Sequence, residues 1–174
     1  VADLHLKLKK RKDMKNLLTV IVPRNIKRTK DIKKQIQIRI PNTKLFRSKF
    51  ITNKTEIIID DSIGQLELWY KNIKTVFLGK SYPPKGGQNP IEPARNGCKI
   101  ISGKMSNFKE IENEMLRNKS IIRVNNANDF LKKIEECING NINTKKIGIN
   151  AKKYVLTKST ILEKTIRKIQ IYLT

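Results

Sequence analysis

The residues with the clearest chemical potential lie between Pro83 and Gly97, in the segment PPKGGQNPIEPARNG. Gly86 and Gly87 carry no side chain just before a predicted helix, so a ligand could approach the backbone closely. The amide groups at a helix start attract anions such as phosphate. Glu92 would lie in the first turn, where its carboxylate could accept paired hydrogen bonds from the hydroxyl groups of a ribose. The segment is therefore a candidate nucleotide site, although a pair of glycines does not establish one.

The same residues also have a purely structural explanation. Asn89 is a favourable N-cap, and Pro90 suits the first helical position because it has no N–H group to leave unpaired. Glu92, at the third helical position, could then fold back on the Asn89 amide in a capping box. The residue pattern leaves both explanations open.

Two further polar segments follow predicted strands. In PRNIKR (23–28), Arg24 could bind a phosphate or a carboxylate with its planar guanidinium, or it could be an ordinary surface arginine. In DDSIGQLE (60–67), Ser62 or Asp61 could cap a helix, and Gly64 would leave its first turn open to a ligand. Ligands of parallel α/β sheets bind beyond the carboxyl ends of the strands, so we expect all three segments to converge on one crevice.

Alternating strand-like and helix-like stretches predict an α/β fold, with a Rossmann-like parallel sheet and flanking helices. The predicted strands are 16–22 (expected to be buried), 56–60, 75–79, 98–103 and 120–124. The predicted helices are 4–15, 29–40, a short one from near Ser62 to Asn72, one following Asn89, 108–118, and most of the chain from Asn126 onward, with a loop at 138–145.

The formal charge of +23 predicts attraction to anionic surfaces. The lysines are spread over nearly every predicted helix, and only 6% of the residues are aromatic. Because there is no basic stripe with aromatic residues to stack bases, we do not expect specific nucleic-acid binding.

Cysteine and histidine usage argues against metal and His-dependent chemistry. Cys98 and Cys137 lie far apart in apolar or helical settings and are expected to be reduced, buried thiols rather than a disulfide or a metal site. His5 is the only histidine, which argues against a His-containing catalytic triad. No apolar run is long enough to span a bilayer. Since the sequence opens on Val1, we expect a fragment of a longer protein.

Together the segments PRNIKR, DSIGQL, GKSYPPKGGQNPIEPA and SGKMSNF resemble, in order and spacing, the carboxyl-terminal half of the bacterial 3-deoxy-D-manno-octulosonic acid (Kdo) transferases. Those enzymes transfer Kdo from CMP-Kdo to lipid A precursor in lipopolysaccharide synthesis. The resemblance extends from Leu4 to about Tyr154 and is most specific from Gly86 to Ala94. It implies a GT-B glycosyltransferase whose second, donor-binding domain corresponds to residues 1–174.

The resemblance also implies roles for particular residues. Glu92 becomes the carboxylate that binds the ribose. The implied contacts to CMP are Pro23, Arg24, Ile63, Gly64, Gln65, Asn89, Pro90, Ile91 and Glu92. The implied supporting residues of the donor loop are Ser81, Gly86, Gly87 and Gln88.

Several positions depart from the family pattern: Gln65 replaces a glutamate, Asn25 and Gln88 replace histidines, Lys80 replaces a glycine, and Lys99 and Lys104 replace prolines. The family's catalytic glutamate and acceptor site lie in the first domain, so the resemblance implies no catalytic base in this chain and no activity of the chain alone. It further implies inverting transfer without a metal or cofactor, at the cytoplasmic face of the bacterial inner membrane. The implied partners are CMP-Kdo, lipid A precursor, an anionic membrane surface and an N-terminal domain absent from this chain.

The sequence leaves open three alternatives to a Kdo transferase. Another GT-B transferase with a different nucleotide sugar would share the fold and the ribose-binding carboxylate. A non-enzymatic basic module could bind nucleic acid or membrane. The substitutions are also compatible with a degenerate, inactive paralogue.

Overall fold

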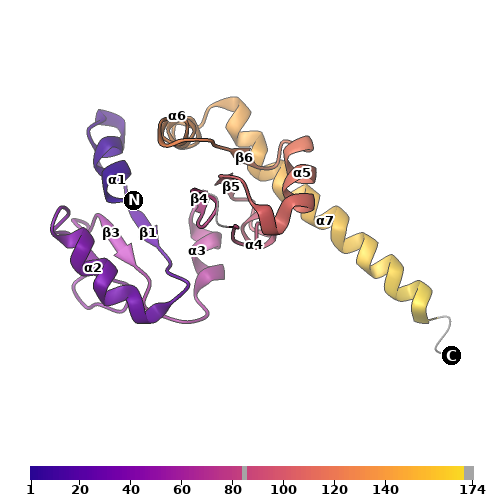
Figure 1. Ribbon diagram of the computed structural model, residues 1–174, viewed down its shortest axis with the longest axis horizontal. Coiled ribbons are helices and arrows are strands. Elements are labelled where there is room, and N and C mark those ends of the chain that lie inside the picture. Colours follow the sequence, from indigo (N-terminus) through magenta and orange to yellow (C-terminus); the bar gives the residue numbers. More distant parts are fainter. Residues whose placement is uncertain (84–85, 171–174) are drawn as a thin grey trace. The chain divides into compact units, whose positions relative to one another are not determined.

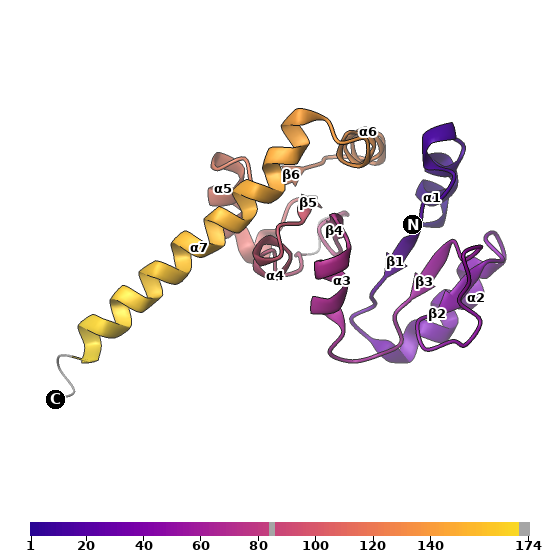
Figure 2. The same ribbon diagram turned by 180° about the vertical axis from the view of Figure 1, so that it is seen from behind.

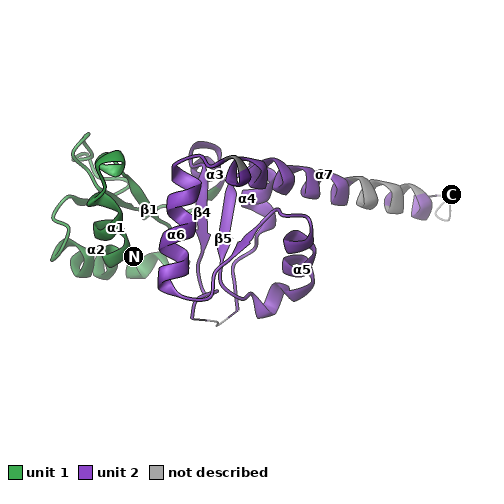
Figure 3. Ribbon diagram, turned by 90° about the horizontal axis from the view of Figure 1, so that it is seen from above, with its two compact units in different colours: residues 1–66 green, residues 67–174 purple. Residues whose placement is uncertain are grey.

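The computed structural model describes the backbone of residues 1–83 and 86–170, and the side chains of these residues except 142, 160–165 and 167. Pro84 and Lys85 of the glycine-containing segment lie outside the described residues. The chain forms two compact units, residues 1–66 and residues 67–174 (Figure 3). Each unit has its own parallel sheet.

Unit 1 contains a sheet of three short strands with helices beside it (Figure 1). Its elements are α1 (Ala2–Lys9), η1 (Lys12–Met14), β1 (Thr19–Ile21), η2 (Ile26–Arg28), α2 (Thr29–Gln37), β2 (Thr43–Leu45) and β3 (Ile57–Ile59). The strand order is β1-β3-β2, and both pairs are parallel.

The central strand β3 is the core of unit 1. Ile57 and Ile59 are fully buried, as expected for a β-branched run in the middle of a parallel sheet. Ile32 and Ile36, four residues apart on α2, pack against the cluster that these residues form with Ile40. One face of α2 is therefore apolar and packs on this cluster.

Two strand predictions for unit 1 need correction, and the helices predicted at 4–15 and 29–40 end earlier, at Lys9 and Gln37. The strand predicted at 16–22 is β1, but its three residues are half-buried rather than buried, because β1 is an edge strand of this three-stranded sheet. Strand β2 was not predicted at all: the segment Thr43–Leu45 contains a lysine and one large apolar residue, so it has no apolar run.

Unit 2 contains the second three-stranded sheet, with the order β4-β5-β6 and only parallel pairs. Its elements are α3 (Leu66–Asn72, whose first residue lies at the unit boundary), β4 (Thr75–Leu78), α4 (Ile91–Arg95), β5 (Lys99–Ser102), η3 (Ser106–Phe108), α5 (Lys109–Arg117), β6 (Ile122–Arg123), α6 (Ala127–Ile138) and α7 (Ile142–Gln170). The long helix α7 runs past α4 and α5 (Figure 2).

The core of unit 2 joins the sheet to its helices. Its buried residues are Leu78, Ala94, Cys98, Ile100, Met105, Met115, Ile121, Ala151, Tyr154 and Val155. Helices α4 and α7 approach closely at Gly148, where a Cβ atom would lie 2.2 Å from the carbonyl oxygen of Gly97. On α6, Phe130 packs edge-to-face on Phe77 of β4 with ring centroids 4.8 Å apart.

Two element boundaries in this part of the chain differ from the predictions. Helix α3 begins at Leu66 and not near Ser62. The predicted loop at 138–145 is shorter, because α6 ends at Ile138 and α7 begins at Ile142. The predicted α/β class with parallel strands is confirmed, and the strands lie in two sheets of three.

Cys98 and Cys137 are buried free thiols, as predicted. Across the described residues, no helix has the length and apolar character needed to cross a membrane.

Candidate functional site

In unit 2, the loops that follow β4 and β5 leave the same edge of the sheet and are bonded to each other. The Gly103 amide donates to Ser81 Oγ at 2.8 Å, and this hydroxyl donates to the Leu78 carbonyl oxygen at 2.5 Å. Ser81 is fully buried. The predicted supporting residue Ser81 therefore links the two strand ends, and its hydroxyl is engaged within the protein.

The glycines of the donor loop are required partly by packing. Gly87 lies against the buried side chain of Met105, and a Cβ atom at Gly87 would be 2.6 Å from Met105 Cγ. Gly86 has a φ of +110°, which few residues other than glycine adopt. Asn107 Nδ2 donates to the Gly87 carbonyl oxygen at 3.2 Å. The loop after β5 thus fixes the backbone at Gly86 and Gly87 without any ligand.

The start of α4 carries an exposed carboxylate. Asn89 Oδ1 accepts a hydrogen bond from the Ile91 amide at 3.0 Å, but the N-cap residue of α4 is Pro90, so the predicted cap at Asn89 lies one residue too early. Regular helix spans Ile91–Arg95. Glu92 is exposed, and among the described residues its carboxylate accepts no hydrogen bond, so the capping box does not form.

Burial of the next turn directs Glu92 outward. Pro93 and Ala94 are buried in the core, whereas Glu92 on the opposite side of the turn is exposed. Burial, together with the negative charge of Glu92, raises the pKa of Tyr70 to about 12. The Glu92 carboxylate is exposed and therefore available to hydroxyl donors.

The predicted anion site at this helix start finds less support. Helix α4 has only five residues, so its dipole is small. Pro90 and Pro93 have no N–H group, and the Ile91 amide is already bonded to Asn89. Few amide groups remain here for a phosphate.

In unit 1, two predicted segments leave the same edge of the sheet, because β1 and β3 are parallel neighbours. Arg24 is exposed after β1. After β3, Ser62 donates its amide to the buried Asp60 Oδ1 at 2.9 Å, and its hydroxyl donates to the same oxygen at 2.5 Å. Neither Ser62 nor Asp61 caps α3, contrary to the prediction, because this turn precedes the helix by several residues.

The remaining predicted residues of the β3 segment are accessible to differing degrees. Ile63 is 85% exposed, Gly64 has a φ of +80° with open space where a Cβ atom would be, and Gln65 is half-buried. Arg47, at the end of the unpredicted strand β2, joins this edge and holds Asp61: its amide donates to Asp61 Oδ1 at 3.0 Å and its Nη2 donates to the Asp61 carbonyl oxygen at 2.7 Å.

The predicted site residues therefore divide between the two units. Unit 1 contains Pro23, Arg24, Ile63, Gly64 and Gln65, and unit 2 contains Ser81, Gly86, Gly87, Gln88, Asn89, Pro90, Ile91 and Glu92. The two segments within unit 1 follow neighbouring parallel strands and leave the same edge of that sheet. Convergence of all three on one crevice stays a prediction.

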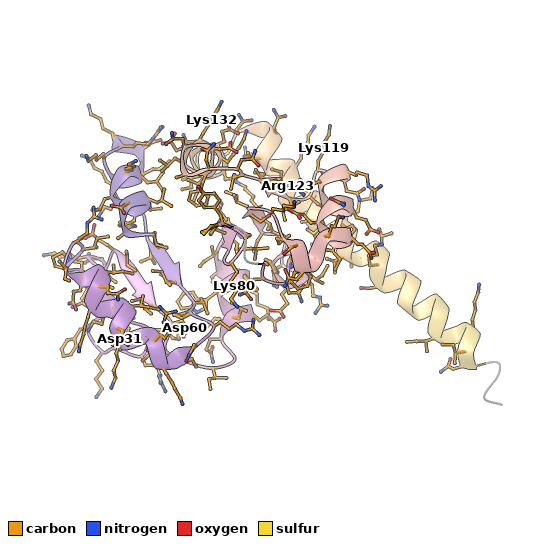
Figure 4. All side chains as sticks on the ribbon, viewed as in Figure 1. Asp31, Asp60, Lys80, Lys119, Arg123 and Lys132 are labelled. Atoms are coloured by element: carbon orange, nitrogen blue, oxygen red, sulfur yellow. The ribbon has the colours of Figure 1, made fainter. Side chains whose placement is uncertain are left out.

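Beside the donor loop is an open hollow of about 320 Å³ at the start of α5. Its lining residues are Ser106, Asn107, Phe108, Lys109, Glu110 and Ile111. Asn107 contributes to this hollow and also binds Gly87. The sequence offered Asn107 only as part of the segment SGKMSNF, without a site role. Lys80 is a further cationic residue near the carboxyl end of β4 (Figure 4).

These groups can bind a polar ligand but offer no obvious nucleophile or metal centre. Burial raises the pKa of both the Cys98 and the Cys137 thiol to about 11, which keeps them protonated near neutral pH. Within the described part of the chain, no three His, Cys, Asp or Glu side chains are grouped to hold a metal ion. Hydrogen-bond recognition is what this arrangement supports best.

Comparison with known proteins gives a consistent picture. The chain is 26% identical to the 3-deoxy-D-manno-octulosonic acid transferase of Haemophilus influenzae over 163 residues, which cover 91% of this chain and 38% of that protein. It is 31% identical to a bifunctional glycosyltransferase/methyltransferase of Fusobacterium nucleatum over 128 residues, covering 71% of this chain and 20% of that protein. The chain thus spans well under half the length of these two relatives. No family model matches it.

Solved structures agree on the fold. The C-terminal CMP-Kdo binding domain of WaaA from Acinetobacter baumannii superposes with a TM-score of 0.70 at 20% identity, covering 89% of this chain and 97% of that one. Sucrose-phosphate synthase from Thermosynechococcus elongatus gives a TM-score of 0.53 at 12% identity, covering 99% of this chain and 49% of that one. These matches confirm the resemblance to the Kdo transferases and the fold of a GT-B C-terminal domain.

Proposed function

We propose that residues 1–174 form the donor-binding domain of a Kdo transferase and hold CMP-Kdo. The observation that carries this proposal is the exposed Glu92 carboxylate, which has no hydrogen-bond donor among the described residues and lies on a turn anchored by Pro93 and Ala94. Similarity to a Kdo transferase over 91% of the chain supports the choice of donor. Glu92 would accept hydrogen bonds from both ribose hydroxyl groups of the cytidine.

The implied reaction is inverting glycosyl transfer in a complete two-domain protein. A carboxylate in the other domain removes the proton of the acceptor hydroxyl group, whose oxygen attacks the anomeric carbon of Kdo. The bond from that carbon to the CMP phosphate oxygen breaks, and the phosphate leaves with the electron pair. General-base assistance of this kind contributes roughly a hundred- to ten-thousandfold. On this proposal the present chain supplies donor binding, no catalytic base, and no metal or cofactor, and is inactive alone.

Charge on the leaving phosphate grows in the transition state, so cations aimed at it stabilise that state most. Arg24 in unit 1 is the candidate for this role, because it is exposed at the end of β1.

The acceptor and location follow from the same proposal. Lipid A precursor is a phosphorylated lipid, and a chain with a formal charge of +23 is suited to an anionic membrane surface. We therefore place the protein at the cytoplasmic face of the bacterial inner membrane.

A second candidate is a GT-B transferase that uses another nucleotide sugar. Similarity to the bifunctional glycosyltransferase/methyltransferase at 31% identity supports keeping it. Calorimetric titration of the 174-residue chain with CMP and with UDP separates the two: preferential binding of CMP supports the Kdo transferase, and preferential binding of UDP supports the alternative. Absence of binding to both nucleotides would contradict the proposal.

A further inference from the structure

A buried carboxylate in unit 2 lies outside the predicted nucleotide contacts. Glu112 of α5 is 1% exposed, and each of its oxygens has one donor. Oε2 accepts from the Met105 amide at 3.0 Å, and Oε1 accepts from Arg123 Nε at 2.9 Å. A buried carboxylate needs such partners, because removing it from water is costly. Glu112 thereby joins the loop after β5 to the end of β6, where Arg123 lies beside α5 (Figure 4).

The residue held by Glu112 touches the donor loop. The Met105 side chain is fully buried and lies against Gly87, with Met105 Cγ 2.6 Å from the position that a Gly87 Cβ atom would take. Two residues further on, Asn107 donates its hydrogen bond to the Gly87 carbonyl oxygen. Displacement of the Met105 backbone would therefore change both supports of Gly87.

We propose that Glu112 is a positioning residue for the donor loop, with Arg123 as its charge partner. Glu112 makes no contact with the nucleotide in this proposal, which rests on the proposed function. The hydrogen bond that Glu112 accepts from the Met105 amide fixes the loop after β5. This loop in turn fixes the position of the Gly87 backbone relative to the nucleotide. Arg123 neutralises and orients the carboxylate so that one oxygen stays on the Met105 amide.

Two variants of the 174-residue chain separate positioning from charge. Glu112→Ala removes the acceptor for the Met105 amide. In the double variant Glu112→Gln, Arg123→Gln, the first glutamine can accept from Met105 through its carbonyl oxygen and donate to the second through its amide group. We expect calorimetry to give a CMP affinity about tenfold weaker for Glu112→Ala, because the loop that supports Gly87 loses its hydrogen bond at the Met105 amide; a tenfold change corresponds to about 1.4 kcal/mol. The double variant should keep nearly wild-type affinity, although it lacks both charges.

Amide NMR signals of Gly86 and Gly87 provide a test that needs no ligand. Glu112→Ala should shift both signals, and the double variant should return them toward their wild-type positions. If the wild-type chain binds no CMP, the proposed function fails, while these signals still test the positioning role.

Should the alanine variant not fold, Glu112→Gln with Arg123 retained replaces it. A glutamine has only one acceptor oxygen, and its NH2 group would face a second donor, so it cannot accept from both Met105 and Arg123. Glu112→Gln alone should therefore also weaken CMP binding, and the additional change Arg123→Gln should restore it. The inference is overturned if the removal of the acceptor leaves the glycine signals and CMP affinity unchanged, or if the double variant is as impaired as the single one.

Discussion

Glu92→Gln isolates the carboxylate on which the proposed function depends. The substitution keeps the side-chain shape and removes the charge. Because Glu92 is exposed and accepts no hydrogen bond among the described residues, the free energy of unfolding should change by less than about 0.5 kcal/mol. Hydrogen bonds to a charged group contribute about 1.5–3 kcal/mol each, and glutamine retains one neutral acceptor for the two ribose hydroxyl groups. We therefore expect a loss of about 1.5–3 kcal/mol in binding, which corresponds to roughly a 10- to 150-fold weaker Kd for CMP.

The assay is calorimetric titration of CMP into the wild-type chain and the variant, with urea unfolding of both proteins. Glu136→Gln is the matched control: it makes the same change of charge on α6, where the half-buried Glu136 pairs with Lys133. The control should bind CMP like the wild type. Equal CMP affinity of Glu92→Gln and the wild type would refute the assignment of Glu92 to the ribose, and a large loss of stability would refute its description as an unpaired surface group.

Three further predictions concern stability and reactivity. Gly103→Ala should destabilise the chain by more than about 1 kcal/mol in urea unfolding, because the new Cβ atom would lie 2.0 Å from the Ser81 carbonyl oxygen. Gly79→Ala is the control: a Cβ atom there would have no other atom within 4 Å, so stability should change little. Cys98 and Cys137 should react with a thiol reagent slowly in the native chain and rapidly in urea, since burial raises both pKa values to about 11; fast native reaction would contradict this. Burial lowers the pKa of His5, although a nearby glutamate has the opposite effect. The midpoint of the His5 NMR titration should therefore lie below about 6.5, and the chain should lose stability as the pH falls below this value. A midpoint at or above about 6.5 would contradict the burial argument.

Local sequence was sufficient where a single element determines its own structure. The run Ile57–Ile59 predicted the central strand of unit 1, and the sequence Asn89-Pro90 predicted the start of α4 to within one residue. Strand β2 was not predicted because Thr43–Leu45 has no apolar run and forms a strand through its pairing with β3. The start of α3 was placed too early because Asp60, and not a helix cap, holds Ser62.

Contacts between distant segments account for what the sequence could not provide in the site. Asn107 reaches Gly87 from 20 residues away, and Glu112 joins Met105 to Arg123 across two loops. No spacing rule encodes these contacts, because they arise only when β4, β5 and β6 are brought together as a sheet. Whether Glu92 forms a capping box could not be decided from the sequence either, since a ligand-binding carboxylate would use the same residues.

The most direct test of the account is an amide NMR titration of the 174-residue chain with CMP. We predict saturable shifts concentrated in residues 86–95 and 103–108, at the ends of β4 and β5. Absence of saturable shifts, or shifts confined to residues remote from these loops such as those of α6, would contradict the claim that this edge of the sheet binds a cytidine nucleotide.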